Sequence, residues 1–177
     1  MAELQGRVLK NYNGYYYLKV EGESEPYTCK VKGKMKKNRF SLATGDIACF
    51  EVSSSEKREG MITGVLPRRN FLPRPTLANL DLFVAAFACA APDFSFLLAD
   101  KLLALAELAK IPAILVLNKE DNAPAGLIDQ VKAVYEPIGY EVYTLSAQNG
   151  TGVEALRERL RGKICAFGGP SGVGKSS

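Results

Sequence analysis

Short runs in which apolar and polar residues alternate occupy the chain from Leu4 to Leu66. Alternation of this kind predicts β-strands with one buried face. The runs are LQGRVLK, GYYYLKV, EPYTCKV, DIACFEV and GMITGVL. Asn13-Gly14 between the first two runs predicts a hairpin, because both residues tolerate a positive φ. Five short strands without a helical pattern favour a small closed barrel, with a five-stranded OB-fold as the first interpretation and an SH3-like barrel as the second.

After residue 76 the pattern changes to continuous apolar runs that alternate with helical periodicity. Buried strands are predicted for LDLFVAAFACA, PAILVLN and KICAFGG, and a further strand for YEVYTLS. Helices are expected over Phe94–Lys110, from about Ala125 to Tyr135, and after a capping box, Thr151-Gly152-Val153-Glu154. Strands and helices that alternate at these lengths predict βαβ units and a parallel sheet covered on both faces.

A proline-rich segment separates the two patterns. The stretch from Pro67 to Thr76, PRRNFLPRPT, contains three prolines and three arginines, which favours an extended connector. We therefore predict a barrel domain over residues 1–67, a connector over 68–76 and an α/β domain over 77–177.

Charge is distributed unevenly along the chain. Residues 1–75 contain 14 Lys and Arg against 8 Asp and Glu, a net charge of +6, whereas residues 76–177 contain 9 against 11, a net charge of −2. A basic first part indicates a polyanionic partner for the barrel. The apolar runs are much shorter than the roughly 18 residues that cross a bilayer, and the N-terminus has no apolar signal-peptide core. We therefore expect a cytoplasmic protein without a membrane partner.

Histidine is absent, and the four cysteines are far apart in apolar surroundings. The chain therefore lacks the ligand spacing of a zinc site and an imidazole base, and the cysteines are interpreted as buried thiols.

A phosphate-binding motif follows the last predicted strand. The stretch Gly169-Pro170-Ser171-Gly172-Val173-Gly174-Lys175-Ser176 matches the pattern G-x-x-x-x-G-K-[ST]. The glycines allow backbone N–H groups to close around phosphates, and Lys175 can reach the β and γ phosphates. The hydroxyl of Ser176 can hold Mg²⁺.

A second motif indicates which base is bound. Asn118-Lys119-Glu120-Asp121 ends the strand PAILVLN, at the sheet edge where open α/β folds bind ligands. The carboxylate of Asp121 can accept hydrogens from guanine N1 and N2, a pair that adenine lacks, while Asn118 and Lys119 brace the loop. Ser146-Ala147 ends the next strand, where GTPases commonly place a backbone N–H on the guanine oxygen. Three such elements at three strand ends predict a guanine nucleotide, GTP or GDP.

The order of the motifs is informative. In ordinary small GTPases the phosphate loop precedes the base-reading motif, but here Asn118 precedes Gly169. A closed set of βα units can be cut at another surface loop without disturbing its sheet. The sequence thus predicts a β-barrel (OB-fold) domain followed by an incomplete, circularly permuted α/β P-loop GTPase domain.

The barrel, the basic connector, L-N-K-x-D, S-A and G-P-S-G-V-G-K-S-S, in this order, resemble the bacterial ribosome-small-subunit-dependent GTPases of the RsgA/YjeQ type. The resemblance extends over essentially the whole chain. It implies a GTPase that binds the small ribosomal subunit late in maturation, with the OB-fold touching ribosomal RNA. It implies guanine-reading roles for Asn118, Lys119, Asp121, Ser146 and Ala147, and phosphate or Mg²⁺ roles for Gly169, Pro170, Ser171, Gly172, Val173, Gly174, Lys175, Ser176 and Ser177.

The resemblance also implies parts that follow the phosphate loop: switch segments, a D-x-x-G aspartate and a zinc-binding domain. No catalytic base or water-positioning residue can therefore be assigned, zinc is expected only beyond Ser177, and residues 1–177 alone are expected to be inactive in hydrolysis. The residue after Asp121 is Asn122, whereas the family usually has leucine at this position. We expect a monomer.

Six positive charges and no acid occur among residues 30–39, namely Lys30, Lys32, Lys34, Lys36, Lys37 and Arg39. Alone, such a run is typical of a solvated loop. Beside Tyr12, Tyr15, Tyr16 and Tyr17, on a barrel type that commonly binds oligonucleotides, it favours contact with nucleic acid, which the resemblance implies is ribosomal RNA. Alternation requires that some of these tyrosines belong to the core.

The alternative function is a nonenzymatic RNA-binding module with an incomplete nucleotide domain.

Overall fold

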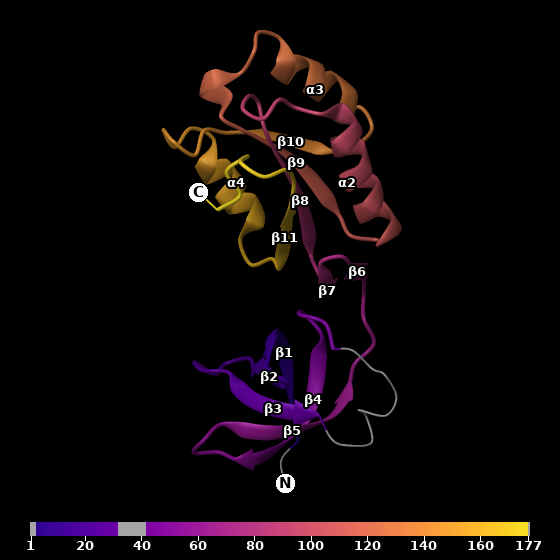
Figure 1. Ribbon diagram of the computed structural model, residues 1–177, viewed down its shortest axis with the longest axis vertical. Helices are drawn as coiled ribbons and strands as arrows, with labels where there is room; N and C mark the ends of the chain where they lie inside the picture. Colours follow the sequence, from indigo (N-terminus) through magenta and orange to yellow (C-terminus); the bar gives the residue numbers. More distant parts are fainter. Residues whose placement is uncertain (1–2, 32–41, 177) are drawn as a thin grey trace. The chain divides into compact units, whose positions relative to one another are not determined.

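The computed structural model describes residues 3–31 and 42–176. The chain divides into two compact units, Met1–Asn79 and Leu80–Ser177 (Figure 1).

The first unit contains a closed five-stranded barrel. Its strands are β1 (Glu3–Tyr12), β2 (Tyr15–Lys19), β3 (Tyr27–Val31), β4 (Ile47–Ser54) and β5 (Glu59–Val65). They close in the order β1-β2-β3-β5-β4, and β3 and β5 run parallel while the other neighbours are antiparallel. This order is that of the OB-fold, so the first interpretation of the alternating runs is confirmed.

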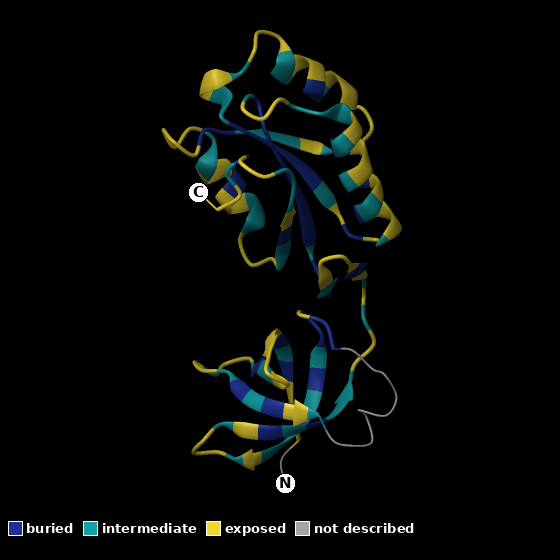
Figure 2. Ribbon diagram, viewed as in Figure 1, coloured by how far each residue is buried: buried dark blue, intermediate teal, exposed yellow. Residues whose placement is uncertain are grey.

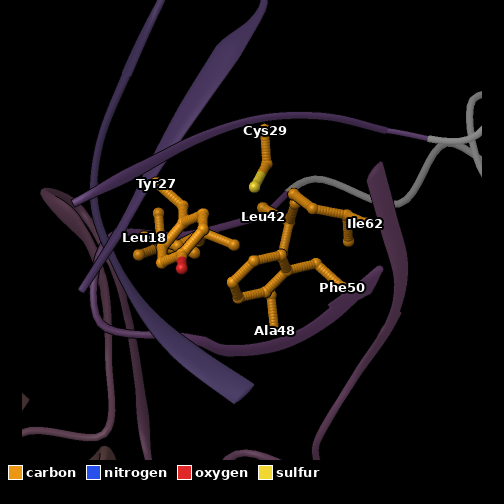
Figure 3. Packing of buried hydrophobic residues seen from close by; sticks show 8 residues of the cluster. Leu18, Tyr27, Cys29, Leu42, Ala48, Phe50 and Ile62 are labelled. Carbon is orange, nitrogen blue, oxygen red and sulfur yellow. The ribbon is translucent and has the colours of Figure 1, made fainter. Parts of the chain in front are cut away.

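Inward-facing side chains from all five strands fill the barrel, as the alternation predicts. The buried residues are Val8, Leu18, Tyr27, Cys29, Leu42, Ala48, Phe50 and Ile62 (Figure 3). The rings of Tyr27 and Phe50 pack with their centroids 5.2 Å apart. Gly60 allows this packing, because a Cβ there would lie 2.6 Å from the Phe50 ring. Asn13 and Gly14 have φ values of 50° and 78°, which confirms the hairpin.

The proline-rich segment differs from the extended connector that the sequence favours. It forms a two-stranded hairpin of β6 (Phe71–Pro73) and β7 (Thr76–Ala78). Polar bonds tie this hairpin to the barrel: the Nε and Nη2 atoms of Arg68 lie 2.7 and 2.8 Å from the Asp46 carboxylate. The Asn79 Nδ2 atom also donates to the carbonyl of Gly45 at 3.0 Å.

The second unit is built around a four-stranded parallel sheet. Its strands are β8 (Leu82–Ala88), β9 (Ala113–Asn118), β10 (Glu141–Thr144) and β11 (Cys165–Gly168), in the order β10-β9-β8-β11. The connecting elements are α2 (Phe96–Leu108), η1 (Glu120–Asn122), α3 (Leu127–Tyr135) and α4 (Val153–Leu160). All seven residues of β8 are buried (Figure 2), which confirms that both faces are covered.

The two faces are covered by different helices. Leu156 of α4 packs against Leu82 and Ile114 on one face. On the other face a chain of rings links β8 to α2 and α3. The centroid distances are 5.1 Å for Phe87–Phe94, 4.9 Å for Phe94–Phe96 and 6.3 Å for Phe96–Tyr135.

The predicted capping box at α4 is wrong. The helix begins after Gly152, whose φ is 71°, and no side chain caps it. A Cβ at Gly152 would lie 2.2 Å from the Thr144 carbonyl, so the close approach to β10 requires glycine. The backbone of Thr151 serves the preceding loop instead, because its carbonyl accepts from the Ser146 N–H at 3.0 Å.

Candidate nucleotide-binding site

The three motifs predicted from the sequence lie after three strands of the same parallel sheet. Asn118 ends β9, Ser146 follows β10, and Gly169 follows β11. Because the strands are parallel, their carboxyl ends share one edge of the sheet, where ligands bind in open α/β folds.

Asn118 connects the motifs to one another. Its side chain is 7% exposed, and its Nδ2 atom donates to the carbonyl of Val173 in the phosphate loop at 2.9 Å. Its Oδ1 atom accepts from the N–H groups of Lys119 at 2.8 Å and Ala147 at 3.0 Å. One buried amide therefore holds the glycine-rich loop, the N-K-x-D loop and the Ser146-Ala147 loop together.

The phosphate loop depends on its glycines. Gly169 has a φ of 152°, and a Cβ there would lie 1.9 Å from the carbonyl oxygen of Ala86. Gly172 and Gly174 have φ values of 81° and 89°, in the left-handed region that favours glycine. Between them Val173 is buried against Ala86 and Ala88 of β8, which anchors the loop to the sheet.

The two basic residues of the motifs differ in their surroundings. Lys119 has a φ of 61°, and its Nζ atom donates to the carbonyl of Ala91 in the loop after β8. The exposed Lys175 donates through Nζ to the carbonyls of Pro170 at 2.5 Å and Gly169 at 3.1 Å. Lys119 thus bonds to the loop after β8, whereas Lys175 bonds to carbonyls of its own loop.

Asp121 is exposed in the η1 turn. Its Oδ2 atom accepts from the Nδ2 atom of Asn122 at 2.7 Å. No other hydrogen bond to this carboxylate occurs within the described residues, so most of its accepting capacity faces outward.

The loop after β10 is tightly folded around Ser146, which is fully buried. Its carbonyl accepts from the Gly150 N–H at 2.8 Å, and its Oγ accepts from the Asn149 N–H at 3.4 Å. The N–H of Ala147, which the sequence places near a guanine oxygen, donates here to Asn118.

A pocket of about 270 Å³ lies between these loops. Its lining residues are Asn118, Lys119, Asp121, Asn122, Ser146, Ala147, Gln148, Gly172 and Gly174. All five predicted guanine-reading residues are among them. The rest of the predicted phosphate loop, from Gly169 to Ser176, follows β11, and Ser177 lies outside the described residues.

Sequence reasoning missed two lining residues, Asn122 and Gln148. Each directly follows a predicted motif, and this adjacency is the signal that could have found them. The backbone of Cys89 lies beside this site, because the Cys89 N–H donates to the Asn118 carbonyl at 2.8 Å. Burial, with Glu120 and Asp121 adding to it, raises the pKa of Cys89 to about 11, so the group stays a neutral thiol.

On the barrel, cation–aromatic pairs lie across β1, β2 and β3. The Nζ atoms of Lys10 and Lys30 each lie 4.6 Å from a ring centroid, those of Tyr17 and Tyr15 respectively. Tyr12 pairs with Tyr15 and is 65% exposed. Tyr16 packs against the core, as alternation requires for part of the tyrosine run. The predicted RNA contacts Lys32, Lys34, Lys36, Lys37 and Arg39 lie outside the described residues.

In the described parts of the chain, no group of three or more His, Cys, Asp or Glu side chains could hold a metal ion. No helix among the same residues is long and apolar enough to cross a membrane.

An OB-fold barrel and a parallel sheet in which the N-K-x-D loop precedes the glycine-rich loop have the fold of a circularly permuted P-loop GTPase. The chain belongs to the RsgA GTPase family. The RsgA GTPase model matches residues 65–177, and the RsgA N-terminal domain model matches residues 5–62.

Two curated relatives are named small ribosomal subunit biogenesis GTPase RsgA. The protein of Caldanaerobacter subterraneus subsp. tengcongensis is 39% identical over 177 residues, covering 100% of this chain and 59% of the relative. That of Agathobacter rectalis is 35% identical over 183 residues, covering 98% and 61% respectively. The chain thus spans about three fifths of the length of these relatives.

Two solved structures are similar over almost the whole chain. YjeQ from Thermotoga maritima has a TM-score of 0.87 and 31% identity, covering 99% of this chain and 63% of the other. YloQ, described as a circularly permuted GTPase, has a TM-score of 0.83 and 29% identity, covering 98% and 62%.

Proposed function

We propose that this chain supplies the guanine-nucleotide site and the RNA-binding barrel of a GTPase that acts in maturation of the small ribosomal subunit. The bonds of Asn118 carry the proposal, because they join the three predicted nucleotide motifs around one pocket. The names of the relatives support the process in which the protein acts. We include in the proposal a cytoplasmic location and a monomeric state.

In this proposal each part of the site has a distinct task. The outward-facing Asp121 carboxylate accepts the two hydrogens of the guanine N1 and N2 edge. The glycine-rich loop directs backbone N–H groups at the phosphates, and Lys175 exchanges its carbonyl contacts for phosphate oxygens. GTPases of this type normally use Mg²⁺, which neutralises phosphate charge, and Ser176 is the hydroxyl that would hold it.

Competition binding with the full-length protein tests the guanine assignment. GDP should compete much better than ADP, and Asp121→Asn should weaken GDP and favour xanthosine diphosphate, because an amide donates where the carboxylate only accepted. Loss of charge-assisted bonds worth about 1.5–3 kcal/mol corresponds to a roughly 10- to 100-fold loss of GDP affinity. Asp129→Asn, an exposed change on α3, is the matched control. Equal affinity of the unmodified protein for GDP and ADP would overturn the assignment.

The exposed tyrosines and lysines of β1, β2 and β3 support the RNA half of the proposal. Aromatic rings stack on bases and lysines neutralise phosphates, which is how sheets of this type bind single strands. Tyr12, Tyr15, Lys10 and Lys30 supply both kinds of group on neighbouring strands. The basic run through Arg39 is proposed to extend this surface.

Cosedimentation with small subunits at several salt concentrations separates the two kinds of contact. Lys30→Ala should reduce affinity and flatten the salt dependence by about 0.7–0.9 log units per decade, because one phosphate contact is lost. Tyr15→Ala should cost about 1–3 kcal/mol of stacking with little change in slope. Lys101→Ala, an exposed change on α2, is the control. If neither barrel variant differs from this control, the RNA contact lies elsewhere, with Lys34, Lys36 and Lys37 the next candidates.

A further inference from the structure

Asn122 is the immediate neighbour of the base-reading carboxylate, and it lines the same pocket. Its Nδ2 atom lies 2.7 Å from Oδ2 of Asp121. The η1 turn fixes the main chain of both residues, since the Asn122 N–H donates to the Lys119 carbonyl at 3.0 Å and the Ala123 N–H donates to that of Glu120 at 3.0 Å. The side-chain bond therefore acts on a carboxylate whose backbone is already held in place.

The rotation of that carboxylate matters for reading guanine. Both oxygens are needed, one for the N1–H and one for an N2–H, so the carboxylate plane must lie close to the plane of the base. The terminal torsion of an aspartate has a broad energy profile, so the carboxylate does not choose one rotation by itself. A charge-assisted bond from Asn122 to one lone pair of Oδ2 restricts the rotation and leaves lone pairs on both oxygens.

We propose that Asn122 is a positioning residue for guanine recognition. By donating to Oδ2 it holds the Asp121 carboxylate in the rotation that accepts both base hydrogens, and it thereby strengthens the discrimination against purines without a 2-amino group. This inference rests on the proposed guanine-nucleotide function.

A nucleotide whose base is hypoxanthine distinguishes a positioning role of Asn122 from a general effect of its substitution on the loop. It presents N1–H but no 2-amino group, so a freely rotating carboxylate can still make its single bond. The affinities of GDP and inosine diphosphate would be measured by calorimetry for the full-length protein, Asn122→Leu and Asn122→Asp. Leucine removes the donor, whereas aspartate keeps the shape and replaces the donor with a like charge.

We expect Asn122→Leu to weaken GDP about 3- to 10-fold, which is the range for one lost hydrogen bond, and inosine diphosphate less than about 2-fold. Asn122→Asp should reduce the ratio of the two affinities further, because two adjacent carboxylates repel each other. In an Asp121→Asn background, Asn122→Leu should have almost no additional effect on GDP, since the group that it positions is gone.

Parallel losses for the two nucleotides, unchanged affinities, or additive effects in the double variant would overturn the role of Asn122. Failure of the proposed function itself would look different, because the unmodified protein would then bind ADP as well as GDP. An unmodified protein that prefers GDP, together with an unchanged ratio in both Asn122 variants, would refute only the positioning role.

Discussion

Two buried asparagines, one in each unit, make similar bonds in different surroundings. Asn79 donates to the Gly45 carbonyl and accepts from the Arg69 N–H at 2.8 Å. Asn118 donates to the Val173 carbonyl and accepts from two N–H groups. Each amide thus ties together loops that are distant in sequence, at 4% and 7% exposure.

The charged groups near the two asparagines differ. Beside Asn79, the fully buried Asp46 carboxylate accepts from the Ala43 N–H at 2.7 Å and from two nitrogens of Arg68. Near Asn118, the charged groups of Asp121 and Lys175 are exposed. A polar cluster whose charges are satisfied internally contributes to the fold, whereas one that directs its charges outward can bind a ligand. This difference makes stability and nucleotide affinity separable by mutation.

The largest loss of stability is expected from Asp46→Ala. It leaves the Arg68 guanidinium, 26% exposed, without its carboxylate and removes the acceptor of the Ala43 N–H. Breaking a buried pair costs about 3–5 kcal/mol, and the partial exposure of Arg68 favours the lower end. Hydrogen exchange measured by mass spectrometry should accelerate in β1 and β4 but not in β8 and β9, and GDP affinity should stay unchanged.

Glu23→Ala is the matched control for Asp46→Ala. It removes another carboxylate–arginine pair from the same unit, with Arg58, but the Glu23 side chain is 39% exposed. An exposed pair is worth less than about 1 kcal/mol. Equal effects of the two variants would show that burial does not distinguish the Asp46 cluster.

Asn118→Ala is expected to lose less stability than Asp46→Ala, but unlike that variant it should also bind GDP much more weakly. The buried Val173 carbonyl loses its donor and the N–H of the exposed Ala147 loses its acceptor, which together cost about 2 kcal/mol. GDP affinity should fall at least about 100-fold, because both neighbouring loops lose their position. Urea unfolding and calorimetry measure the two effects. Asn149→Ala, which removes a bond within one exposed loop, is the control, and a similar result for both variants would contradict the central position of Asn118.

The repeating elements could be predicted from the sequence, because burial on one or both faces leaves a periodic pattern. The alternation around Leu18 and the continuous apolar run of β8 are examples. The structure has a strand at both places, β2 and β8. The hairpin at 71–78 was not predicted, since it depends on Asp46, Arg68 and Asn79, polar residues that follow no period. The spacing of Thr151 and Glu154 wrongly predicted a capping box, because the close approach of Gly152 to β10 determines where α4 begins.

In the candidate site, too, some features could be predicted from the sequence and others could not. The motifs assigned to guanine and to phosphate could be located in the sequence, because that chemistry requires particular residue types at fixed spacing, and their binding roles stay predictions. The parallel order of the strands places all three loops at one edge of the sheet, where the Asn118 amide links them. The contact of Asn122 with Asp121 depends on the η1 turn, and that of Lys119 with Ala91 on a left-handed residue, so neither could be read from spacing.

The smallest loss of stability is expected from Lys175→Ala, although nucleotide binding should weaken strongly. The exposed side chain contacts only carbonyls of its own loop within the described residues, so its removal should change the free energy of unfolding by less than about 0.5 kcal/mol. GDP affinity should nevertheless fall about 100-fold, or roughly 2.7 kcal/mol, because the charge that we propose to bind the phosphates is removed. Lys175→Arg keeps the charge but not the compact ammonium group and should bind with intermediate affinity. If Lys175→Ala instead unfolds as easily as Asn118→Ala, the lysine belongs to the fold rather than to the ligand site, and the distinction between satisfied and outward-facing polar clusters fails at this residue.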